Sequence, residues 1–178
     1  MEYVYLVASL PHLDLTGAPP FTSADLLLSC GGVLRQDHWE DLRAIVEGRP
    51  QDVLAPEARN LLDAETQLRN ALARIRAQRA GVEYAARSHP HAGFDARLEE
   101  VAARAMAADD PLQRELLLDR QRWALLDEAA AQTAFGVQAV FAYALKLQIV
   151  EKWAALSDQA GLDMALRVVK GNLVGISL

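Results

Sequence analysis

Two long stretches in the C-terminal part of the chain decide the fold: residues 111–128, PLQRELLLDRQRWALLDE, and residues 135–153, FGVQAVFAYALKLQIVEKW. In the first, apolar residues recur every three or four positions, which is typical of an amphipathic helix. The second is apolar nearly all round in its first half, which indicates a helix at the centre of a core. Both patterns predict helices, and neither carries an evident chemical role.

The composition of the whole chain favours an all-α fold. Ala and Leu dominate the 178 residues, while Gly, Pro and β-branched residues are sparse, and this bias favours helices when it is summed along the chain. With 52% hydrophobic residues, the chain is long enough and apolar enough for one domain with a substantial core. We predict a single domain over residues 1–178, built as a helical bundle.

Charge and apolar runs limit the partners and the location of the protein. The net charge of −6 argues against a nucleic-acid binder, because such proteins use basic surfaces that displace phosphate counterions. The longest apolar run, residues 134–150, contains Gln138, Lys146 and Gln148, so it is too short and too polar to cross a bilayer. The single cysteine, Cys30, cannot form an intrachain disulfide, and the first residues lack the basic region of a secretory signal. We expect a cytoplasmic protein that binds no nucleic acid and does not insert into a membrane.

The opening segment, YVYLVASLP at residues 3–11, is rich in β-branched and aromatic residues and ends at a proline. This local composition favours a strand, so the fold prediction includes an extended N-terminal segment. The sequence offers no second convincing strand to pair with it. Its backbone groups must therefore pair with the edge of a partner, unless helical surroundings override the local preference.

Glycines mark the predicted ends of several helices. A short helix that begins with Ser23 as its cap is predicted to close at Gly31, in the left-handed conformation that ends many helices. In the same way, Gly161 is predicted to end the central helix, residues 137–156. Residues 162–170 would then form a last short helix, and the apolar tail after it would dock on the bundle.

The segment 56–87 carries the pattern of one long helix. Leu61, Leu68, Ile75 and Val82 recur every seven residues, and a stripe this narrow is typical of a helix that packs on one other helix. A helix of about 27 residues would be about 40 Å long, which is longer than a domain of this size needs. We therefore expect one end of this helix, or of a helical hairpin built from it, to project from the core.

Four arginines lie beside this stripe, in the only basic part of the chain: Arg69, Arg74, Arg76 and Arg79. Charge next to an apolar stripe is typical of a solvated helix face. The alternative is a surface for an acidic helical partner, which a row of arginines would favour through association rate and register. Both interpretations stay open, and the four arginines are the predicted partner-binding residues.

Asp119 falls on the apolar face of the helix predicted over residues 111–128, on the same side as Trp123. A carboxylate in that place needs a partner. Arg122, three residues on, is the nearest candidate, although Arg120 or a group from another helix could take its place. We predict that Asp119 and Arg122 form a structural ion pair. A catalytic carboxylate would need a second reactive group and a cleft, and the sequence points to neither.

The other candidate groups stand alone. His89 and His91 flank Pro90 in a predicted loop, and no nearby Cys, His or acidic spacing completes the three or four ligands of a zinc site. Cys30 is expected to be a small buried side chain, since a nucleophilic thiol would need a basic partner. No glycine-rich phosphate loop occurs. We predict a protein that is not an enzyme and that has no catalytic residue, no metal and no cofactor.

Four blocks of the sequence carry a family resemblance: YVYLVASLPHLDL at residues 3–15, PPFTSADLLLSCGG at 19–32, DPLQRELLLDRQRWALLDE at 110–128 and AYALKLQIVEKW at 142–153. Together they resemble an uncharacterised bacterial family encoded in the operons of V/A-type ATPases. In those operons the protein stands where the C subunit would be. A full-length C subunit has a triplicated helical fold, and this chain is too short for three copies.

The resemblance implies a function in a rotary ATPase. It would be a non-enzymatic subunit or assembly factor, a C-subunit-like helical adaptor of the central stalk between the rotor shaft and the membrane ring. Its partners would be V/A-type ATPase subunits, and the complex would hold it at the inner membrane as a peripheral protein. The alternative that the residues leave open is a small helical enzyme or ligand-binding protein, with a pocket near Asp119 and Trp123.

Overall fold

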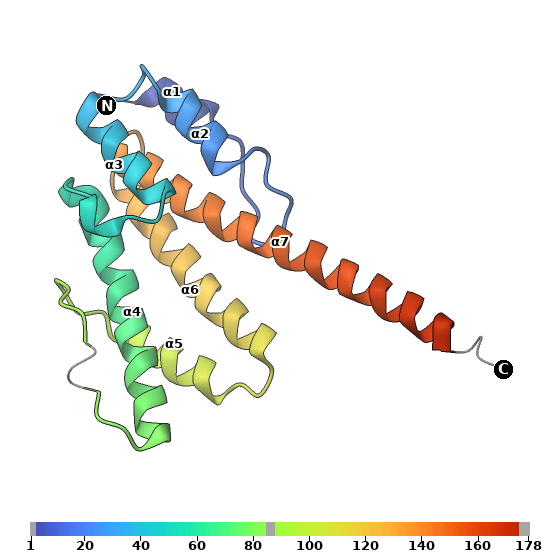
Figure 1. Ribbon diagram of the computed structural model, residues 1–178. Coiled ribbons are helices and arrows are strands. Elements are labelled where there is room, and N and C mark those ends of the chain that lie inside the picture. The colour runs from blue at the N-terminus through green and yellow to red at the C-terminus, as the bar shows by residue number, and fades with distance from the viewer. Residues whose placement is uncertain (1–2, 85–87, 175–178) are drawn as a thin grey trace.

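The computed structural model describes residues 3–84 and 88–174, with side chains as far as Leu156. Throughout these ranges the protein is an all-helical bundle without strands, so the predicted fold class is confirmed (Figure 1). Its elements are α1 (Val4–Ser9), α2 (Ser23–Cys30), α3 (Gln36–Val46), the short 3-10 helix η1 (Pro50–Asp52), α4 (Pro56–Ala80), α5 (Ala96–Ala107), α6 (Pro111–Gln132) and α7 (Val137–Val174).

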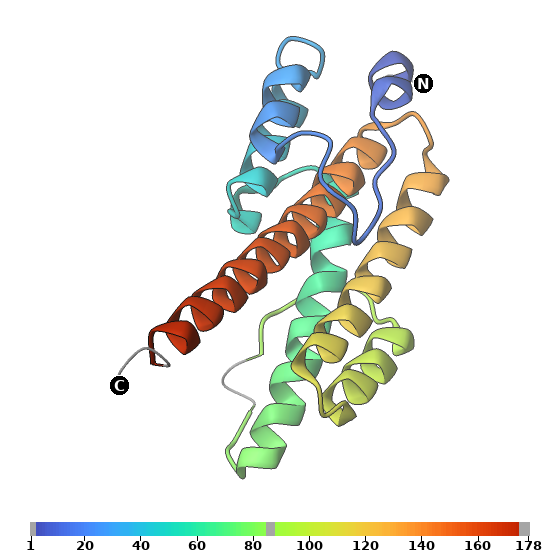
Figure 2. The same cartoon turned by 90° about the vertical axis from the view of Figure 1, so that its right-hand side faces the viewer.

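The first half of α7 forms the axis of the bundle. It pairs with α6 as a helical hairpin, α2 and α3 cover another side of it, and α4 contacts both α6 and α7 (Figures 1 and 2). Helix α5 packs between α4 and α6 at the opposite end from α2 and α3. Every helix from α2 to α6 therefore takes its place relative to the hairpin of α6 and α7.

The apolar pattern of α7 explains its central position. Val140, Phe141, Leu147 and Val150 are all fully buried, and they spread over about half of the helix circumference instead of marking one narrow stripe. They belong to an apolar cluster shared with α1, α2, α3 and the start of α4. A second apolar cluster joins α4, α5 and α6 around Leu98. The predicted central helix is thus confirmed, and it is the first of these clusters that holds it.

The opening segment is a helix, α1, so the predicted extended conformation is wrong for residues 4–9. Tyr3 fixes the start of this helix. Its buried hydroxyl hydrogen-bonds with Nδ1 of His38 at 2.7 Å, and its backbone N–H donates to the carbonyl oxygen of Phe135 at 3.1 Å. Leu6 is buried, while Tyr5 is 92% exposed. Contact with α3 and with the α6–α7 turn therefore overrides the strand preference of the residues.

Helix α2 has the predicted length, but its ends are built differently. Its N-cap is Thr22, whose hydroxyl accepts from the backbone N–H of Asp25 in a capping box. Ser23 instead donates from its backbone N–H (2.7 Å) and hydroxyl (2.5 Å) to the carboxylate of Glu151 on α7. At the other end the left-handed residue is Gly32, with φ of 78°, and not Gly31. Ser23 therefore does not cap the helix with its side chain; it binds a carboxylate 128 residues away in the sequence.

Helix α4 ends at Ala80, earlier than the predicted segment 56–87. Gly81 has φ of 66° and closes the helix in the left-handed conformation; residues 85–87 lie outside the described residues. The expected projection of one end of α4 is not confirmed. Its second half packs on α5 through the cluster around Leu98, in which Leu68 and Leu72 are buried.

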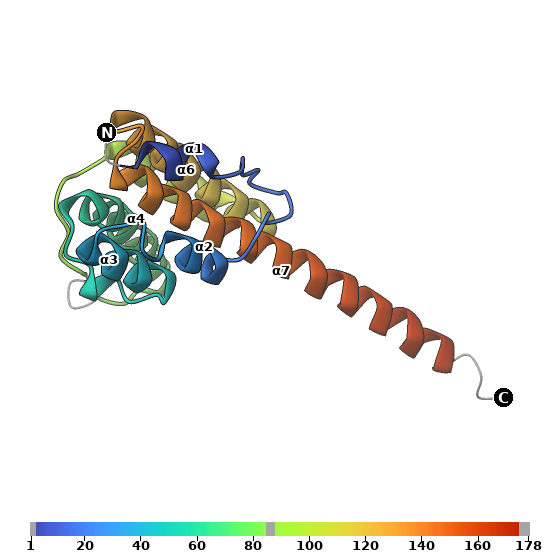
Figure 3. The same ribbon diagram turned by 90° about the horizontal axis from the view of Figure 1, so that it is seen from above.

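Helix α7 continues through Gly161 to Val174, so the predicted break and separate last helix are wrong. One glycine in a helix costs only about 1 kcal/mol relative to alanine, and helix-favouring residues flank this one. The end of α7 leaves the rest of the bundle (Figure 3). The predicted docking of the apolar tail concerns side chains outside the described ones. Among the described residues, no helix combines the length and the hydrophobicity that a membrane span requires.

Candidate functional site

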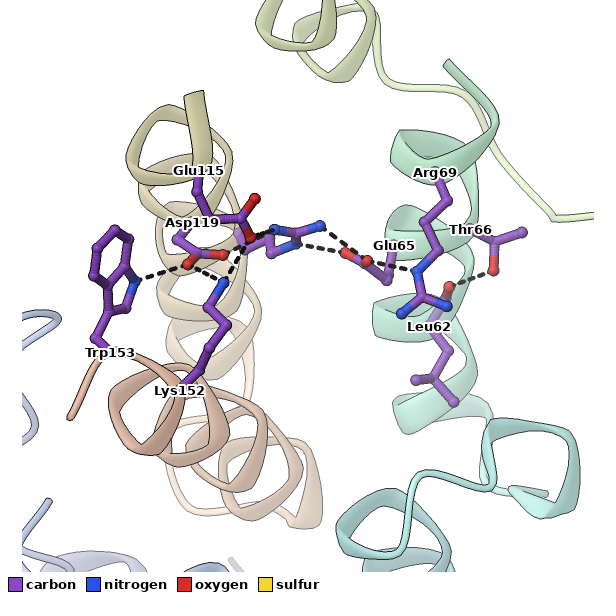
Figure 4. Close-up of polar contacts among 9 residues, drawn as sticks. Leu62, Glu65, Thr66, Arg69, Glu115, Asp119, Lys152 and Trp153 are labelled. Atoms are coloured by element: carbon purple, nitrogen blue, oxygen red, sulfur yellow. Dashed lines mark hydrogen bonds and ion pairs between the residues drawn. The ribbon is translucent and has the colours of Figure 1, made fainter. Parts of the chain in front are cut away.

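A cluster of charged side chains lies where α4, α6 and α7 meet (Figure 4). Asp119 is at its centre, on α6, and is fully buried. Helix α4 contributes Glu65 and Arg69 to the cluster, and α7 contributes Lys152 and Trp153, which contact Asp119 directly. The hairpin of α6 and α7 and the distant helix α4 therefore share one group of polar contacts.

The carboxylate of Asp119 accepts three donors from two helices. Its Oδ1 accepts from Nη1 of Arg122 at 2.8 Å. Its Oδ2 accepts from the indole N–H of Trp153 at 2.8 Å and contacts the ammonium of Lys152. A buried carboxylate is tolerated when it is paired and hydrogen-bonded in this way. The structure thus brings Asp119 and Arg122 together, and it adds two partners from α7 that the sequence analysis missed.

Arg122 links α6 to α4. Its Nε and Nη2 donate to the two carboxylate oxygens of Glu65, at 2.8 and 3.1 Å, which is the bidentate geometry that a guanidinium favours. Burial alone would lower the pKa of Arg122, but the hydrogen bonds and charges of Glu65 and Asp119 outweigh it and raise the pKa. Arg122 therefore stays charged, and the two hydrogen bonds of its guanidinium group to Glu65 fix the distance between α6 and α4.

Lys152 and Glu115 complete the charged cluster, in which cations and carboxylates alternate. Lys152 also donates to Glu115 at 2.7 Å, and Glu115 lies 3.7 Å from Nη1 of Arg122. Three cations, on Arg69, Arg122 and Lys152, thus face three carboxylates. Every charged group of this cluster is thus engaged with at least one group of opposite charge, and several of these pairs run between helices. This arrangement suits the joining of helices.

A cleft of about 400 Å³ opens beside this cluster, between α4 on one side and α6 and α7 on the other. Its charged part contains Asp119, Arg122 and Lys152, and its walls are leucines and an isoleucine from all four surrounding helices: Leu61, Leu62, Leu68, Leu98, Leu125, Leu126, Leu145 and Ile149. The pocket expected near Asp119 and Trp123 is present only in part. Trp123 is not among the described residues that line it, and the ammonium of Lys146 lies 4.2 Å from the centre of its ring.

The four predicted partner-binding arginines of α4 do not behave alike. Nε of Arg69 donates to Glu65 at 2.9 Å, but its side chain is 74% exposed. Arg74 pairs with Glu99 and ties α4 to α5. Arg76 and Arg79 are exposed, and within the described part of the chain they form no ion pair. Arg74 is thus used inside the protein, whereas the other three remain open to a partner.

Cys30, His89 and His91, which stand alone in the sequence, lie in surroundings that offer no reactive partner among the described residues. Burial raises the pKa of the Cys30 thiol to about 11, so the thiolate that a nucleophile needs is disfavoured. The backbone N–H and C=O of His89 both pair with the side chain of Asn70, at 3.1 and 2.7 Å. His91 is a partly buried neighbour in the same loop. Over the described residues, no three His, Cys, Asp or Glu side chains come together as a metal site would require.

Comparison with known proteins finds one similarity. Residues 94–173 match a family model described as "Protein of unknown function (DUF2764)". The match covers α5, α6 and nearly all of α7, so it includes Asp119, Arg122, Lys152 and Trp153 but not Glu65 on α4. No curated protein and no solved structure matches the chain. The similarity therefore points to an uncharacterised family, and it comes without a described activity or partner.

Proposed function

We propose that the protein is a non-enzymatic helical subunit or assembly factor of a V/A-type ATPase, with a C-subunit-like adaptor function at the central stalk. The observation that carries this proposal is the resemblance of the four sequence blocks to the family encoded in the operons of those ATPases. Two of these blocks, residues 110–128 and 142–153, lie in the region that matches the uncharacterised family. The protein would work in the cytoplasm, held peripherally at the membrane by the complex.

The chemistry of the charged cluster supports a function without catalysis. Its carboxylates and cations are engaged with each other and join α4, α6 and α7. Three exposed cations of α4, on Arg69, Arg76 and Arg79, are suited to an acidic helical surface of a stalk subunit. Such pairs at the rim of an interface mainly increase the association rate and fix the register.

Co-purification tests this proposal. The full-length protein would carry an affinity tag in its own bacterium, and the ATPase subunits recovered with it would be quantified by mass spectrometry. We expect the stalk subunits with the wild type, and a clear loss of them with the triple variant Arg69→Glu, Arg76→Glu and Arg79→Glu.

A second triple variant provides the matched control for this experiment. Arg59→Glu near the start of α4, Arg104→Glu on α5 and Arg120→Glu on α6 make the same change of charge at other exposed positions, and recovery should stay near that of the wild type. Both variants should keep the wild-type melting temperature. Equal recovery of the stalk subunits with all three proteins, at low and moderate salt, would exclude Arg69, Arg76 and Arg79 as the contact. Absence of every ATPase subunit from the wild-type sample would reject the proposed function.

The cleft supports a second candidate, a ligand-binding protein or small enzyme. Its volume of about 400 Å³ and its mixture of apolar walls and charged groups fall within the usual range of small-molecule sites. Native mass spectrometry of the protein purified from its own bacterium tests this second candidate. A small molecule retained in stoichiometric amount, and lost when Ala64 in the cleft wall is replaced by phenylalanine, would favour it.

A further inference from the structure

The cleft has apolar walls that the folded chain leaves partly uncovered. Leu61 and Leu62 on α4, Leu125 on α6 and Leu145 on α7 all line it, and all four are only partly buried. Apolar side chains gathered around an open space lose contact with water when another apolar group fills it, which is favourable in proportion to the area covered. The cleft is therefore suited to receive a few apolar side chains.

The shape of the cleft favours side chains that come from a helix. Helix α4 lines one side of the cleft and α6 and α7 line the other, and α7 diverges from α4 towards its C-terminal end, so the cleft is bounded by helices that spread apart (Figures 1 and 2). A groove between helices is a common site for an amphipathic helix, whose apolar residues at positions three, four and seven apart enter it. A volume of about 400 Å³ holds such side chains, while the partner helix itself would lie across the mouth.

The charges beside the cleft specify the partner. On α4, Leu61, Glu65, Arg69 and Arg76 follow one another at spacings of four, four and seven residues, which puts all of them on the same side of the helix. Arg69 uses only its Nε in the bond to Glu65, and Arg76 forms no ion pair with any described residue. The leucine wall therefore continues directly into a row of available guanidinium groups.

The charged cluster can give up one of its contacts at low cost. Glu65 is shared between Arg69 and Arg122, and Arg122 holds both of its oxygens. A carboxylate from a partner could take the place of Glu65 on exposed Arg69. Arg122 would keep both Glu65 and Asp119, so no buried charge would lose its partner.

We infer that this cleft is the docking groove for an amphipathic, acidic helix of another protein. Apolar side chains of the partner fill the space between Leu62 and Leu145, and its Asp or Glu residues pair with Arg69 and Arg76. The inference refines the partner surface of the proposed function and rests on it for the identity of the partner, but the groove and its charge preference follow from this chain.

Site-specific photo-cross-linking tests the groove in the full-length protein. A benzophenone amino acid would replace Leu62 or Leu145 in the wall of the cleft, and cells of the source bacterium would be irradiated. The same amino acid at Leu28 on α2 and Leu112 on α6, which are 78% and 55% exposed, provides the control. We expect adducts from the two cleft positions to one helical segment in which apolar residues recur three or four positions apart and Asp or Glu residues lie beside them, and few adducts from the controls.

Charge reversal makes this test specific for the inferred chemistry. Arg69→Glu together with Arg76→Glu should lower the adduct yield by at least about tenfold, and replacing the acidic residues of the captured segment by lysine should restore it. Ala64→Leu, which narrows the cleft from its wall, should lower the yield without lowering the melting temperature. Adducts at the control level, a captured segment without acidic residues, or a yield insensitive to charge reversal would each overturn the inference.

The outcomes for the groove and for the proposed function can be told apart. ATPase subunits that co-purify with the protein but cross-link outside the cleft would reject the groove and leave the function standing. An acidic helix captured in the cleft from a protein outside the ATPase would support the groove and reject the function. A small molecule that occupies the cleft in stoichiometric amount would overturn the inference of a helical occupant.

Discussion

Helix α7 contacts the bundle in two different ways along its length. Between Val137 and Val150 its apolar side chains, among them fully buried Phe141 and Leu147, are packed in apolar clusters. At Lys152 and Trp153 its polar contacts converge on Asp119. Apolar packing holds a helix through many small contacts that add up, whereas the polar contact depends on one carboxylate. The two regions should therefore respond differently to single substitutions.

The largest expected effect is at the polar region. Asp119→Ala removes the acceptor shared by Arg122, Lys152 and Trp153 and leaves cations in a buried place. We expect the free energy of unfolding to fall by about 3–5 kcal/mol, measured by urea denaturation at neutral pH. The matched control is Asp127→Ala on the same helix, whose 55% exposed carboxylate pairs with Lys146 and should contribute less than about 1 kcal/mol. Equal losses in the two variants would show that Asp119 has no special structural importance.

The apolar region should lose less when one side chain is shortened. Leu147→Ala removes buried methyl groups from the apolar cluster that also contains Phe141 and should lower the free energy of unfolding by about 2–4 kcal/mol, because the lost transfer energy adds to that of the cavity. Leu156→Ala, at the 46% exposed end of the described side chains of α7, serves as the control and should change little. A Leu147→Ala loss above that of Asp119→Ala would reverse the proposed contrast between the two regions.

The smallest effect concerns pH in the apolar region. Cys30, on α2, is fully buried in the apolar cluster that packs on this part of α7, and burial raises the pKa of its thiol to about 11 from an ordinary value of 9.0. The folded protein then holds this proton more tightly than the unfolded chain does. Its contribution to stability is complete below pH 9 and is lost as the pH rises through about 11.

Urea denaturation curves across this pH range measure the effect on Cys30. The free energy of unfolding of the wild type should fall more steeply with pH than that of Cys30→Ala. The comparison is needed because Tyr143, whose pKa is raised to about 12 by burial, also titrates at alkaline pH. Parallel curves for the two proteins would contradict a buried, neutral thiol.

The parts of the fold that follow from repeated local patterns could be predicted from the sequence. The all-round apolar run of α7 predicted its central position, and the placement of Asp119 on an apolar face predicted that it would need a partner. Periodicity reports the side of a helix on which a residue lies, but not what it meets there. Glu65 and Trp153 lie 54 and 34 residues from Asp119, and no spacing within a helix connects them.

The wrong predictions have the same physical origin. Residues 4–9 prefer a strand locally, yet the contacts of Tyr3 with His38 and Phe135 hold them as a helix. Gly161 is a helix breaker by propensity, but its cost of about 1 kcal/mol is too small to stop a helix that its neighbours favour. Local preferences of this size decide the structure only where no larger contribution opposes them.

The continuity of α7 has a mechanical consequence. Its 38 residues form a rod about 57 Å long, of which the part after Trp153 makes up about 30 Å. The contacts of Lys152 and Trp153 with Asp119 are the last described contacts that attach α7 to the bundle. If the helix tilted by about 10° at this point, its far end would move by about 5 Å. Small adjustments of hydrogen bonds among three helices would thus be amplified into movement on the scale of a helical turn.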